Sequence, residues 1–290
     1  MTFKNKIAII TGGSEGIGFG IASALASQGA HVYLLARTQE KLQTARDKIQ
    51  SQGGRADIYP VDITNQAEMR GIIDEVYGKN NRLDIFVNNA GEWTGQTIGA
   101  KLADGEWVEQ TPEANQEDIR RTNSLIFEAP FEITTYLTAK FKPLTNNQLQ
   151  ILTIDSQAGL KYMPGNLGYG AGKMSLAVSL LHLQGELNEL DLSHIKLYAL
   201  YPGTVATPKL LPLIKAGSLQ NPTTLESVVD TAINMLRGRT PSKHAYVGYR
   251  PGRGIVAEYL EFKPKKFSLL PLIGEPQVID ANFTPEDLLH

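Results

Sequence analysis

The chain has 290 residues and no cysteine, and this absence removes several kinds of chemistry at once. A disulfide framework, a thiolate nucleophile and cysteine-ligated zinc or iron–sulfur sites are all excluded. A charge excess is also missing, because 28 lysines and arginines face 30 aspartates and glutamates, a formal net charge of −2. Without a basic excess to neutralise a phosphate backbone, nucleic acid is not expected as a partner.

Long hydrophobic runs do not occur either. No stretch of about 18 consecutive apolar residues is present, so no membrane-spanning helix is predicted. The first apolar stretch, residues 7–10, is too short for the central region of a signal peptide, and we expect a cytoplasmic protein. The five histidines are scattered without an H-E-x-x-H motif, so no metal site is predicted.

Short apolar runs rich in β-branched residues recur along the chain and predict strands that are buried on both faces. They occupy residues 6–10, 31–35, 56–61, 83–87, 150–154, 195–200 and 245–247. Segments with helical periodicity lie between them, and we expect Gly29 and Gly78 to end the first and third helices. The alternation predicts a doubly wound α/β fold with a mainly parallel sheet of about seven strands.

The predicted organisation is a single domain over residues 1–249 and an extended C-terminal arm over residues 250–290. The arm is rich in proline, and we expect it to pack on the domain or on a neighbouring subunit. Its lysines near residue 265 suit an anionic membrane surface as well, but three lysines are too few for stable membrane anchoring. Residues 92–117 are polar and weakly periodic and are expected to form a long loop.

A glycine-rich stretch from Thr11 to Gly18 follows the first predicted strand and precedes the first predicted helix. Glycines at 12, 16 and 18 let the backbone turn tightly and approach a pyrophosphate, which the helix N-terminus would hold. The spacing Gly-x3-Gly-x-Gly differs from the commoner G-x-G-x-x-G, and such a turn by itself also occurs without a ligand.

Further motifs follow in order between the third strand and residue 207. They are Asp62, Asn88-Asn89-Ala90-Gly91, Asn123, Ser156, Tyr169-x3-Lys173 and Pro202-Gly203-Thr204-Val205-Ala206-Thr207. Together with the glycine turn, the series resembles the short-chain dehydrogenase/reductase family, in the type that has the Gly-x3-Gly-x-Gly and Tyr-x3-Lys motifs. The resemblance implies a Rossmann-type fold, an oxidoreductase activity and a nicotinamide dinucleotide cofactor.

Tyr169 and Lys173 lie four residues apart at the start of a predicted helix, so their side chains share one face. A phenol ordinarily has a pKa near 10, and a neighbouring ammonium favours its phenolate form. Such pairs are also common on helix surfaces without any function. The resemblance implies a catalytic set of Asn123, Ser156, Tyr169 and Lys173. In it, Ser156 and Tyr169 stabilise the carbonyl oxygen, Lys173 holds the nicotinamide ribose and Asn123 helps to hold a water.

The resemblance also assigns residues to the cofactor. They are Gly12, Ser14, Glu15, Gly16, Ile17, Gly18, Arg37, Asp62, Ile63, Asn89, Ala90, Gly91, Tyr169, Lys173, Pro202, Gly203, Val205 and Thr207. In this assignment Asn89 braces the sheet and Asp62 lies against the adenine. Two alternatives stay open, because residues 88–91 also suit a simple turn and Asp62 also suits a cap of the helix after Thr64.

The end of the second predicted strand bears on the choice of nicotinamide. NAD-preferring proteins place an acidic residue there, which binds the adenosine ribose. Ala36 occupies this position and Arg37 follows it, and a guanidinium suits a 2′-phosphate. We therefore expect NADP(H) in preference to NAD(H). Glu15 in the glycine turn argues the other way, and a solvated surface arginine is the alternative.

Substrate is expected at the loops beyond the carboxyl edge of the sheet. Residues 210–214, Leu-Leu-Pro-Leu-Ile, resemble the mobile substrate flap of the family in position and favour a partly hydrophobic substrate, although a buried helix explains them equally well. Trp93 and Trp107 border the pocket in one interpretation and belong to a surface insertion in the other. The family resemblance also implies a homodimer or homotetramer. The apolar face of Leu176, Leu180, Leu183 and Leu187 suits either that interface or the core.

The sequence as a whole predicts an NADP(H)-dependent oxidoreductase that interconverts a ketone or aldehyde with its alcohol, with Tyr169 as the acid/base. One alternative is a catalytically silent sensor of dinucleotides, for which we expect a broken catalytic set. The other is an epimerase or dehydratase on the same scaffold. All four residues of the implied catalytic set are present in this chain.

Overall fold

Strands and helices alternate along most of the chain. The computed structural model describes residues 3–92, 99–101, 107–109, 112–161, 167–217, 222–250 and 254–260. The strands of the main sheet are β1 (Ile7–Thr11), β2 (His31–Ala36), β3 (Arg55–Pro60), β4 (Ile85–Asn88), β7 (Leu149–Ile154), β8 (Ile195–Pro202), β9 (His244–Arg250) and β10 (Gly254–Leu260). The helices are α1 (Gly16–Ala26), α2 (Gln39–Ser51), α3 (Gln66–Asn80), α4 (Pro112–Asn123), η1 (Ser124–Glu128), α5 (Ala129–Phe141), η2 (Gln157–Gly159), α6 (Leu167–Glu189), α7 (Leu211–Lys215) and α8 (Leu225–Leu236).

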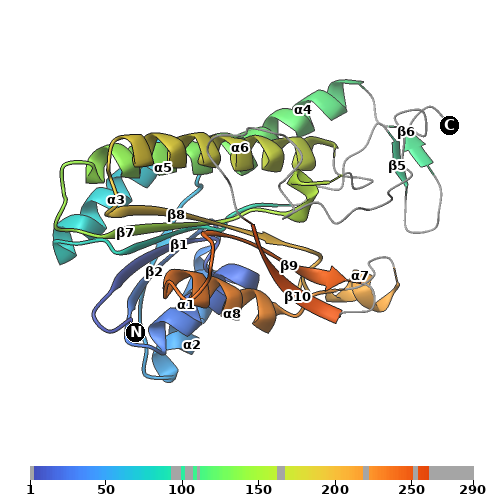
Figure 1. Cartoon of the computed structure of the whole chain (residues 1–290). Coiled ribbons are helices and arrows are strands. Elements are labelled where there is room, and N and C mark those ends of the chain that lie inside the picture. The colour runs from blue at the N-terminus through green and yellow to red at the C-terminus, as the bar shows by residue number, and fades with distance from the viewer. Residues whose placement is uncertain are drawn as a thin grey trace.

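The main sheet has the strand order β10-β9-β8-β7-β4-β1-β2-β3, and all its neighbouring strands are parallel except β9 and β10. Helices α1, α2 and α8 cover one face, and α3, α5 and α6 cover the other (Figure 1). This is a doubly wound α/β fold of the Rossmann type. The sheet has one strand more than the seven expected, because β10 adds an antiparallel edge.

The central strands are buried on both faces, which explains their continuously apolar sequences. All five residues of β1 and all four of β4 are buried. Successive side chains of a strand point to opposite faces, so Ala8 and Ile10 pack toward α1 and α8, whereas Ile7 and Ile9 pack toward α3 and α5. The apolar residues Leu176, Leu180 and Leu187 of α6 are buried within the chain, so they belong to the core.

Two local expectations were wrong. The segment over residues 92–117, expected as a loop, contains the antiparallel pair β5 (Gly99–Lys101) and β6 (Trp107–Glu109) and the start of α4. Helix α3 continues through Gly78 and is followed by Asn81, whose φ of 52° is left-handed. Asparagine tolerates this conformation better than most residues, so it ends the helix in place of glycine.

The arm predicted for residues 250–290 begins with the edge strand β10. Residues 261–290, including the lysines near residue 265, lie outside the described residues, as does Trp93. Among the helices that the structure describes, none combines the length and the apolar character needed to cross a membrane.

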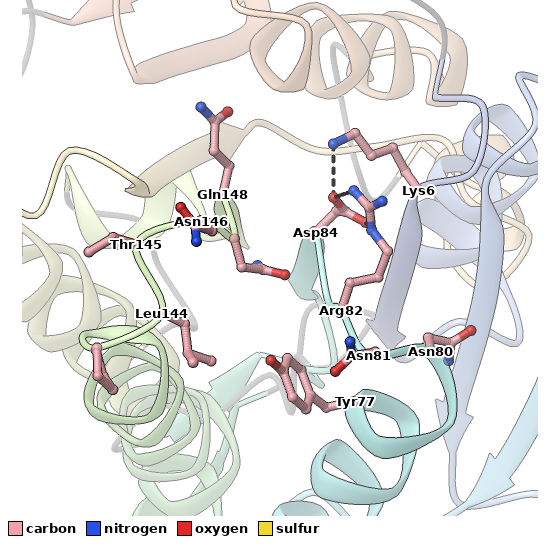
Figure 2. Close-up of a pocket in the computed structure, with 12 residues that line it drawn as sticks. Lys6, Tyr77, Asn80, Asn81, Arg82, Asp84, Leu144, Thr145, Asn146 and Gln148 are labelled. Atoms are coloured by element: carbon pink, nitrogen blue, oxygen red, sulfur yellow. Dashed lines mark hydrogen bonds and ion pairs between the residues drawn. The ribbon is translucent and has the colours of Figure 1, made fainter.

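Asp84 is buried at the amino edge of the sheet, directly before β4. Its carboxylate accepts hydrogen bonds from Lys6 Nζ at 2.8 Å, Arg82 Nε at 2.8 Å and the backbone N–H of Ile7 at 2.9 Å. Burial raises the pKa of Asp84, but the hydrogen bonds from Arg82, Lys6 and Ile7 outweigh it, and the pKa is lowered. Figure 2 shows the three charged side chains beside a pocket bordered by the ends of α3 and α5. Ligands of open α/β sheets bind at the carboxyl edge, so we interpret Asp84 as a structural residue.

We expect Asp84→Asn to lower the free energy of unfolding by about 2 kcal/mol at about pH 7, because the charge that pairs with Lys6 and Arg82 is lost and an NH2 group replaces one of the two accepting oxygens. An acid with a depressed native pKa stabilises the fold above its unfolded pKa near 4 and loses this contribution as the pH falls through the native pKa. The difference between wild type and variant should therefore be complete at neutral pH and shrink below about pH 4.

Urea unfolding at neutral and acid pH measures this difference. The control is Asp47→Asn, since Asp47 is 64% exposed and pairs with its neighbour Arg46 at the surface. That variant should change the unfolding free energy by less than about 0.5 kcal/mol. Equal stability of wild type and Asp84→Asn at neutral pH would contradict the structural role of Asp84.

Candidate active site

The glycine turn joins β1 to α1 at the carboxyl edge of the sheet. Gly12 and Gly16 have φ values of +62° and +57°, in the left-handed region that L side chains rarely adopt. At Gly18 a Cβ atom would lie 2.3 Å from the carbonyl oxygen of Gly12 and 2.4 Å from Nδ2 of Asn89. The three glycines thus keep the backbone close-packed and leave the N-terminus of α1 open.

Asn89 fastens the end of β4 to this turn. Its Nδ2 donates to the carbonyl oxygens of Thr11 at 3.0 Å and Gly12 at 3.2 Å. In return the Thr11 hydroxyl accepts the backbone N–H groups of Asn89 at 2.9 Å and Ala90 at 3.0 Å. Strands β1 and β4 are neighbours whose following connections leave to opposite faces, the point at which ligands bind in such sheets.

The segment after β8 reaches the same place. Gly203 N–H donates to the carbonyl of Val247 at 2.7 Å, and buried Val205 forms a bridge with Thr223. A Cβ atom on Gly16 would lie 3.5 Å from the methyl carbon of Thr207. The segment from Pro202 to Thr207 therefore lies beside the start of α1.

Lys173 is buried although it carries a charge, with 4% of its surface exposed. Its Nζ donates to the carbonyl oxygen of Ile154 at 2.8 Å and lies 5.8 Å from the centre of the Tyr169 ring. Helix η2, which follows Ser156, packs on α6 so closely that a Cβ on Gly159 would lie 2.8 Å from the carbonyl carbon of Lys173.

The Ser156 side chain has a defined hydrogen-bonding role. Its Oγ accepts the backbone N–H of Ala158 at 3.1 Å, as the cap of η2. A hydroxyl that accepts one hydrogen bond keeps its own O–H as a donor. Ser156 is therefore able to donate to an oxygen atom of a ligand.

Asn123 ends α4 at the point where the helix changes to the π-helical turn η1. The N–H of Ala129 donates to the carbonyl of Ser124, the i→i+5 pattern of a π-helix. Such turns are rare and frequently occur at functional sites. The Oδ1 of Asn123 lies 3.3 Å from the place of a Cβ on Gly172. The side chain thus lies against α6 at the residue before Lys173.

Charged side chains from separate loops pair beside the glycine turn. The Glu92 carboxylate accepts a hydrogen bond from Lys209 Nζ at 3.0 Å and lies 3.8 Å from Arg37. The hydrogen bond from Lys209 lowers the pKa of Glu92. Glu15, before α1, pairs with Lys41 of α2 at 3.0 Å. The sequence motifs missed Glu92, Lys41 and Lys209, because only the fold brings these charges together.

Asp62 and Ile63 follow β3 at the same edge. Asp62 Oδ1 accepts the backbone N–H and the hydroxyl of Thr64 at 2.9 and 2.8 Å. The cap of α3 is Asn65, whose side chain accepts the N–H of Glu68. The alternative that Asp62 caps this helix is therefore wrong. The Ile63 side chain is buried in the core, so its backbone is the part that can face a ligand.

Asp155, between β7 and Ser156, was also missed from the sequence. It is 4% exposed, and its Oδ1 accepts the N–H of Ser156 at 2.9 Å. The other oxygen, Oδ2, has no hydrogen-bond partner among the described residues. The one feature of the sequence that could have indicated Asp155 is a charged residue directly after a mostly apolar strand.

The fold and this edge of the sheet define a Rossmann-type protein with a glycine-rich turn between β1 and α1, beside the strand where the direction of the crossover connections changes. The family model for short chain dehydrogenases matches residues 6–215. The chain therefore belongs to the short-chain dehydrogenase family.

Three similar proteins illustrate the range of this likeness. A fatty acyl-CoA reductase of Acinetobacter baylyi is 43% identical over 88 residues, 30% of this chain and 30% of that protein. A cyclopentanol dehydrogenase of Comamonas sp. is 28% identical over 214 residues, 73% of this chain and 78% of that protein. The solved structure of a 7α-hydroxysteroid dehydrogenase, complexed with NADH and 7-oxo glycochenodeoxycholic acid, superimposes with a TM-score of 0.68 at 24% identity. That likeness covers 84% of this chain and 92% of the other. The chain thus spans less than a third of the length of the first of these relatives.

We expect Gly18→Ala to destabilise the fold by about 2–3 kcal/mol, because the new methyl would overlap the backbone of Gly12. Dinucleotide binding, followed by nicotinamide fluorescence, should weaken by more than about tenfold as the turn shifts. The matched control is Gly71→Ala in α3, where a Cβ meets nothing within 4 Å. Alanine is the better helix former, so this control should gain up to about 1 kcal/mol. Similar unfolding midpoints for both variants would contradict the close packing at Gly18.

Proposed function

We propose that the protein is an NADP(H)-dependent oxidoreductase that interconverts a ketone or aldehyde with its alcohol. The observation that carries the proposal is the buried Lys173 ammonium, 5.8 Å from the Tyr169 ring and packed beside the loop of Ser156. Membership of the short-chain dehydrogenase family supports the reaction class. The names of the cyclopentanol and 7α-hydroxysteroid dehydrogenases support a carbonyl or alcohol substrate.

The residues present fit a nicotinamide dinucleotide. The left-handed glycines and the absent Cβ at Gly18 let the backbone of the turn pack closely in front of the N-terminus of α1, where backbone N–H groups favour the negative charge of a pyrophosphate. When bound, the nicotinamide supplies or accepts the hydride. Its remaining contacts are assigned to residues around the glycine turn and the ends of β2, β3, β4 and β8, namely Ser14, Glu15, Ile17, Arg37, Asp62, Ile63, Asn89, Ala90, Gly91, Pro202, Gly203, Val205 and Thr207.

Tyr169 exchanges the proton with the substrate oxygen, and the Lys173 ammonium lies 5.8 Å from the centre of its ring. Ser156 donates a second hydrogen bond to that oxygen, since its own oxygen already accepts the N–H of Ala158. Lys173 also holds the ribose hydroxyls, and Asn123 holds a water near α6. Positioned acid–base groups of this kind contribute about 10²–10⁴-fold to the rate.

We expect Tyr169→Phe to retain NADPH binding within about twofold and to lose at least about 10²-fold in turnover, because only the phenolic proton is removed. Nicotinamide fluorescence measures the binding, and NADPH oxidation with a carbonyl substrate measures the turnover. Tyr33→Phe is a control, since the Tyr33 hydroxyl accepts from Asn80 on the α3 side of the sheet. Normal turnover in Tyr169→Phe would exclude Tyr169 as the acid/base.

The preference for NADP(H) rests on the end of β2. Ala36 offers no carboxylate to a ribose, and Arg37 is 66% exposed beside the turn, where its guanidinium can bind a 2′-phosphate in exchange for its 3.8 Å ion pair with Glu92. Glu15 argued against a phosphate, but Lys41 lies 3.0 Å from its carboxylate. That pairing reduces the repulsion which Glu15 would exert on a bound phosphate.

We expect Arg37→Ala to weaken NADPH binding by about tenfold at low salt, because one charge-assisted contact to phosphate is lost. NADH lacks this phosphate, so its affinity should change by less than about twofold. The NADPH effect should shrink at high ionic strength, since Arg37 is exposed. Arg46→Ala on α2 is the control, and equal losses of NADPH and NADH affinity in Arg37→Ala would contradict the preference.

The substrate is proposed to be partly hydrophobic. Helix α7 follows the Pro202–Thr207 segment and has no buried residue, and Leu211 is 38% exposed. The alternative of a buried helix at this position is therefore wrong. We propose instead that α7 is an apolar flap over the substrate site at the carboxyl edge of the sheet. Assembly into a homodimer or homotetramer stays a prediction, for which exposed Leu167 and Met174 of α6 offer apolar surface.

A further inference from the structure

Asp155 is a buried acid that takes no part in the proposed proton transfer. Its Oδ1 accepts the N–H of Ser156 at 2.9 Å, and its Oδ2 is buried without a hydrogen-bond partner among the described residues. A buried carboxylate without full hydrogen bonding is costly unless a positive charge compensates it. The neighbouring charges therefore decide what this residue does.

The direction of the side chain follows from the strand. Asp155 N–H donates to the carbonyl of Leu200 at 2.8 Å, so the pairing of β7 with β8 continues to this residue. Side chains alternate between faces, which places Thr153 and Asp155 on the face opposite Leu152 and Ile154. On that face Tyr201 of β8 packs against α6, the helix that bears Lys173. Asp155 is thus enclosed between the sheet and α6.

Two titratable side chains, Lys173 and Tyr201, interact electrostatically with Asp155, and a third, His244, lies beside Tyr201. Lys173 comes from α6, and its Nζ donates to the carbonyl of Ile154, the residue before Asp155. Tyr201 comes from β8, and its hydroxyl lies 3.3 Å from Nδ1 of His244 on β9. Burial lowers the pKa of His244 to about 3, so this histidine is neutral near pH 7. The cation that acts on Asp155 is therefore Lys173.

The titration of Asp155 agrees with this arrangement. Burial raises the pKa of Asp155 to about 7, although the Lys173 ammonium and the N–H of Ser156 act in the opposite direction. Burial and the charge of Asp155 together raise the pKa of Tyr201 well above its usual value, so Tyr201 stays protonated. Asp155 thus changes its charge near neutral pH, close to Lys173.

We propose that Asp155 is a positioning residue whose charge acts on the Lys173 ammonium, which the Ile154 carbonyl holds, and sets, through that ammonium, the pH range in which Tyr169 exchanges its proton. The inference rests on the proposed roles of Tyr169 and Lys173. An anion near the ammonium offsets part of the positive charge that favours the phenolate. Removal of the Asp155 charge would therefore favour the phenolate form of Tyr169.

The test follows Tyr169 directly in the full-length protein. Tyrosine labelled with ¹³C at Cζ reports the phenol and phenolate forms by NMR, and the Tyr169 signal is the one missing from Tyr169→Phe. In Asp155→Asn the amide oxygen still accepts the N–H of Ser156, while the charge is removed. We expect the Tyr169 midpoint to fall by on the order of one pH unit. An unchanged midpoint in the folded variant would overturn the proposal.

The matched control is Thr153→Val. Thr153 lies on the same face of β7, is also buried and also has an unpartnered side-chain oxygen, but it carries no charge. This variant should leave the Tyr169 midpoint where it is in the wild type. An equal shift in Thr153→Val would assign the effect to altered packing and would overturn the proposal.

A second variant keeps the inference testable if Asp155→Asn does not fold. In wild-type protein labelled with ¹³C at the aspartate carboxyl, Asp155 is the signal with a midpoint near 7. Lys173→Met removes the ammonium, and the Asp155 midpoint should rise by on the order of one pH unit. No rise would mean that the two charges do not interact, which overturns the proposal.

Enzyme kinetics separate this inference from the proposed function. If Tyr169 is the acid/base, the rising limb of the kcat/KM profile for alcohol oxidation should move to lower pH in Asp155→Asn by the same amount as the NMR midpoint. A shift by NMR without one in kcat/KM would support the coupling of Asp155 with Tyr169 and refute the catalytic role of Tyr169.

Discussion

The hydrogen bonds between Thr11 and Asn89 are the constraint on which the rest of the site at the carboxyl edge of the sheet depends. The Thr11 hydroxyl accepts two backbone N–H groups from the end of β4, and the Asn89 amide donates to two carbonyls of the glycine turn. The chain leaves these two adjacent strands toward opposite faces. Without these bonds, the N–H groups of Asn89 and Ala90 and the carbonyls of Thr11 and Gly12 would lose these partners. Each unsatisfied group costs about 1–3 kcal/mol. These hydrogen bonds fix the position of the glycine turn and therefore of the start of α1, where the pyrophosphate is proposed to bind.

Close backbone packing brings together the segments that carry the proposed catalytic set. Gly159 lets η2 approach the backbone of Lys173, and Gly172 leaves room for the Asn123 side chain. The four residues come from α4, the loop after β7 and α6, and the two glycines let these segments approach one another closely. The apolar residues behind them, such as Leu176, pack on β8 and hold α6 against the sheet. The core that stabilises the fold therefore also positions Tyr169 and Lys173.

Asp84 and Asp155 show how hydrogen bonding decides the charge of a buried acid. They are 3% and 4% exposed and lie at opposite edges of the same sheet. Asp84 accepts from two cations and a backbone N–H, and its pKa is lowered. Asp155 accepts one N–H and keeps an unpartnered oxygen, and its pKa is raised to about 7. At similar burial, the hydrogen bonds to Asp84 thus favour its ionised form at the amino edge, whereas burial raises the pKa of Asp155 to about 7 beside the proposed catalytic residues.

The sequence by itself determined the doubly wound fold and the order of its motifs. Seven strands begin and end within three residues of the apolar runs, because burial on both faces leaves a pattern in the local sequence that does not depend on the neighbouring strands. Motifs that directly follow parallel strands lie at the same carboxyl edge of the sheet. The glycine turn and Asn89 each follow such a strand, so their location at one edge could also be predicted from the sequence. The tertiary structure alone decided the edge strand β10, the pairing of Glu92 with Lys209, and the enclosure of Asp155 beside Lys173. These features depend on which distant segments become neighbours, and the energy of a charge depends on those neighbours and on its access to water.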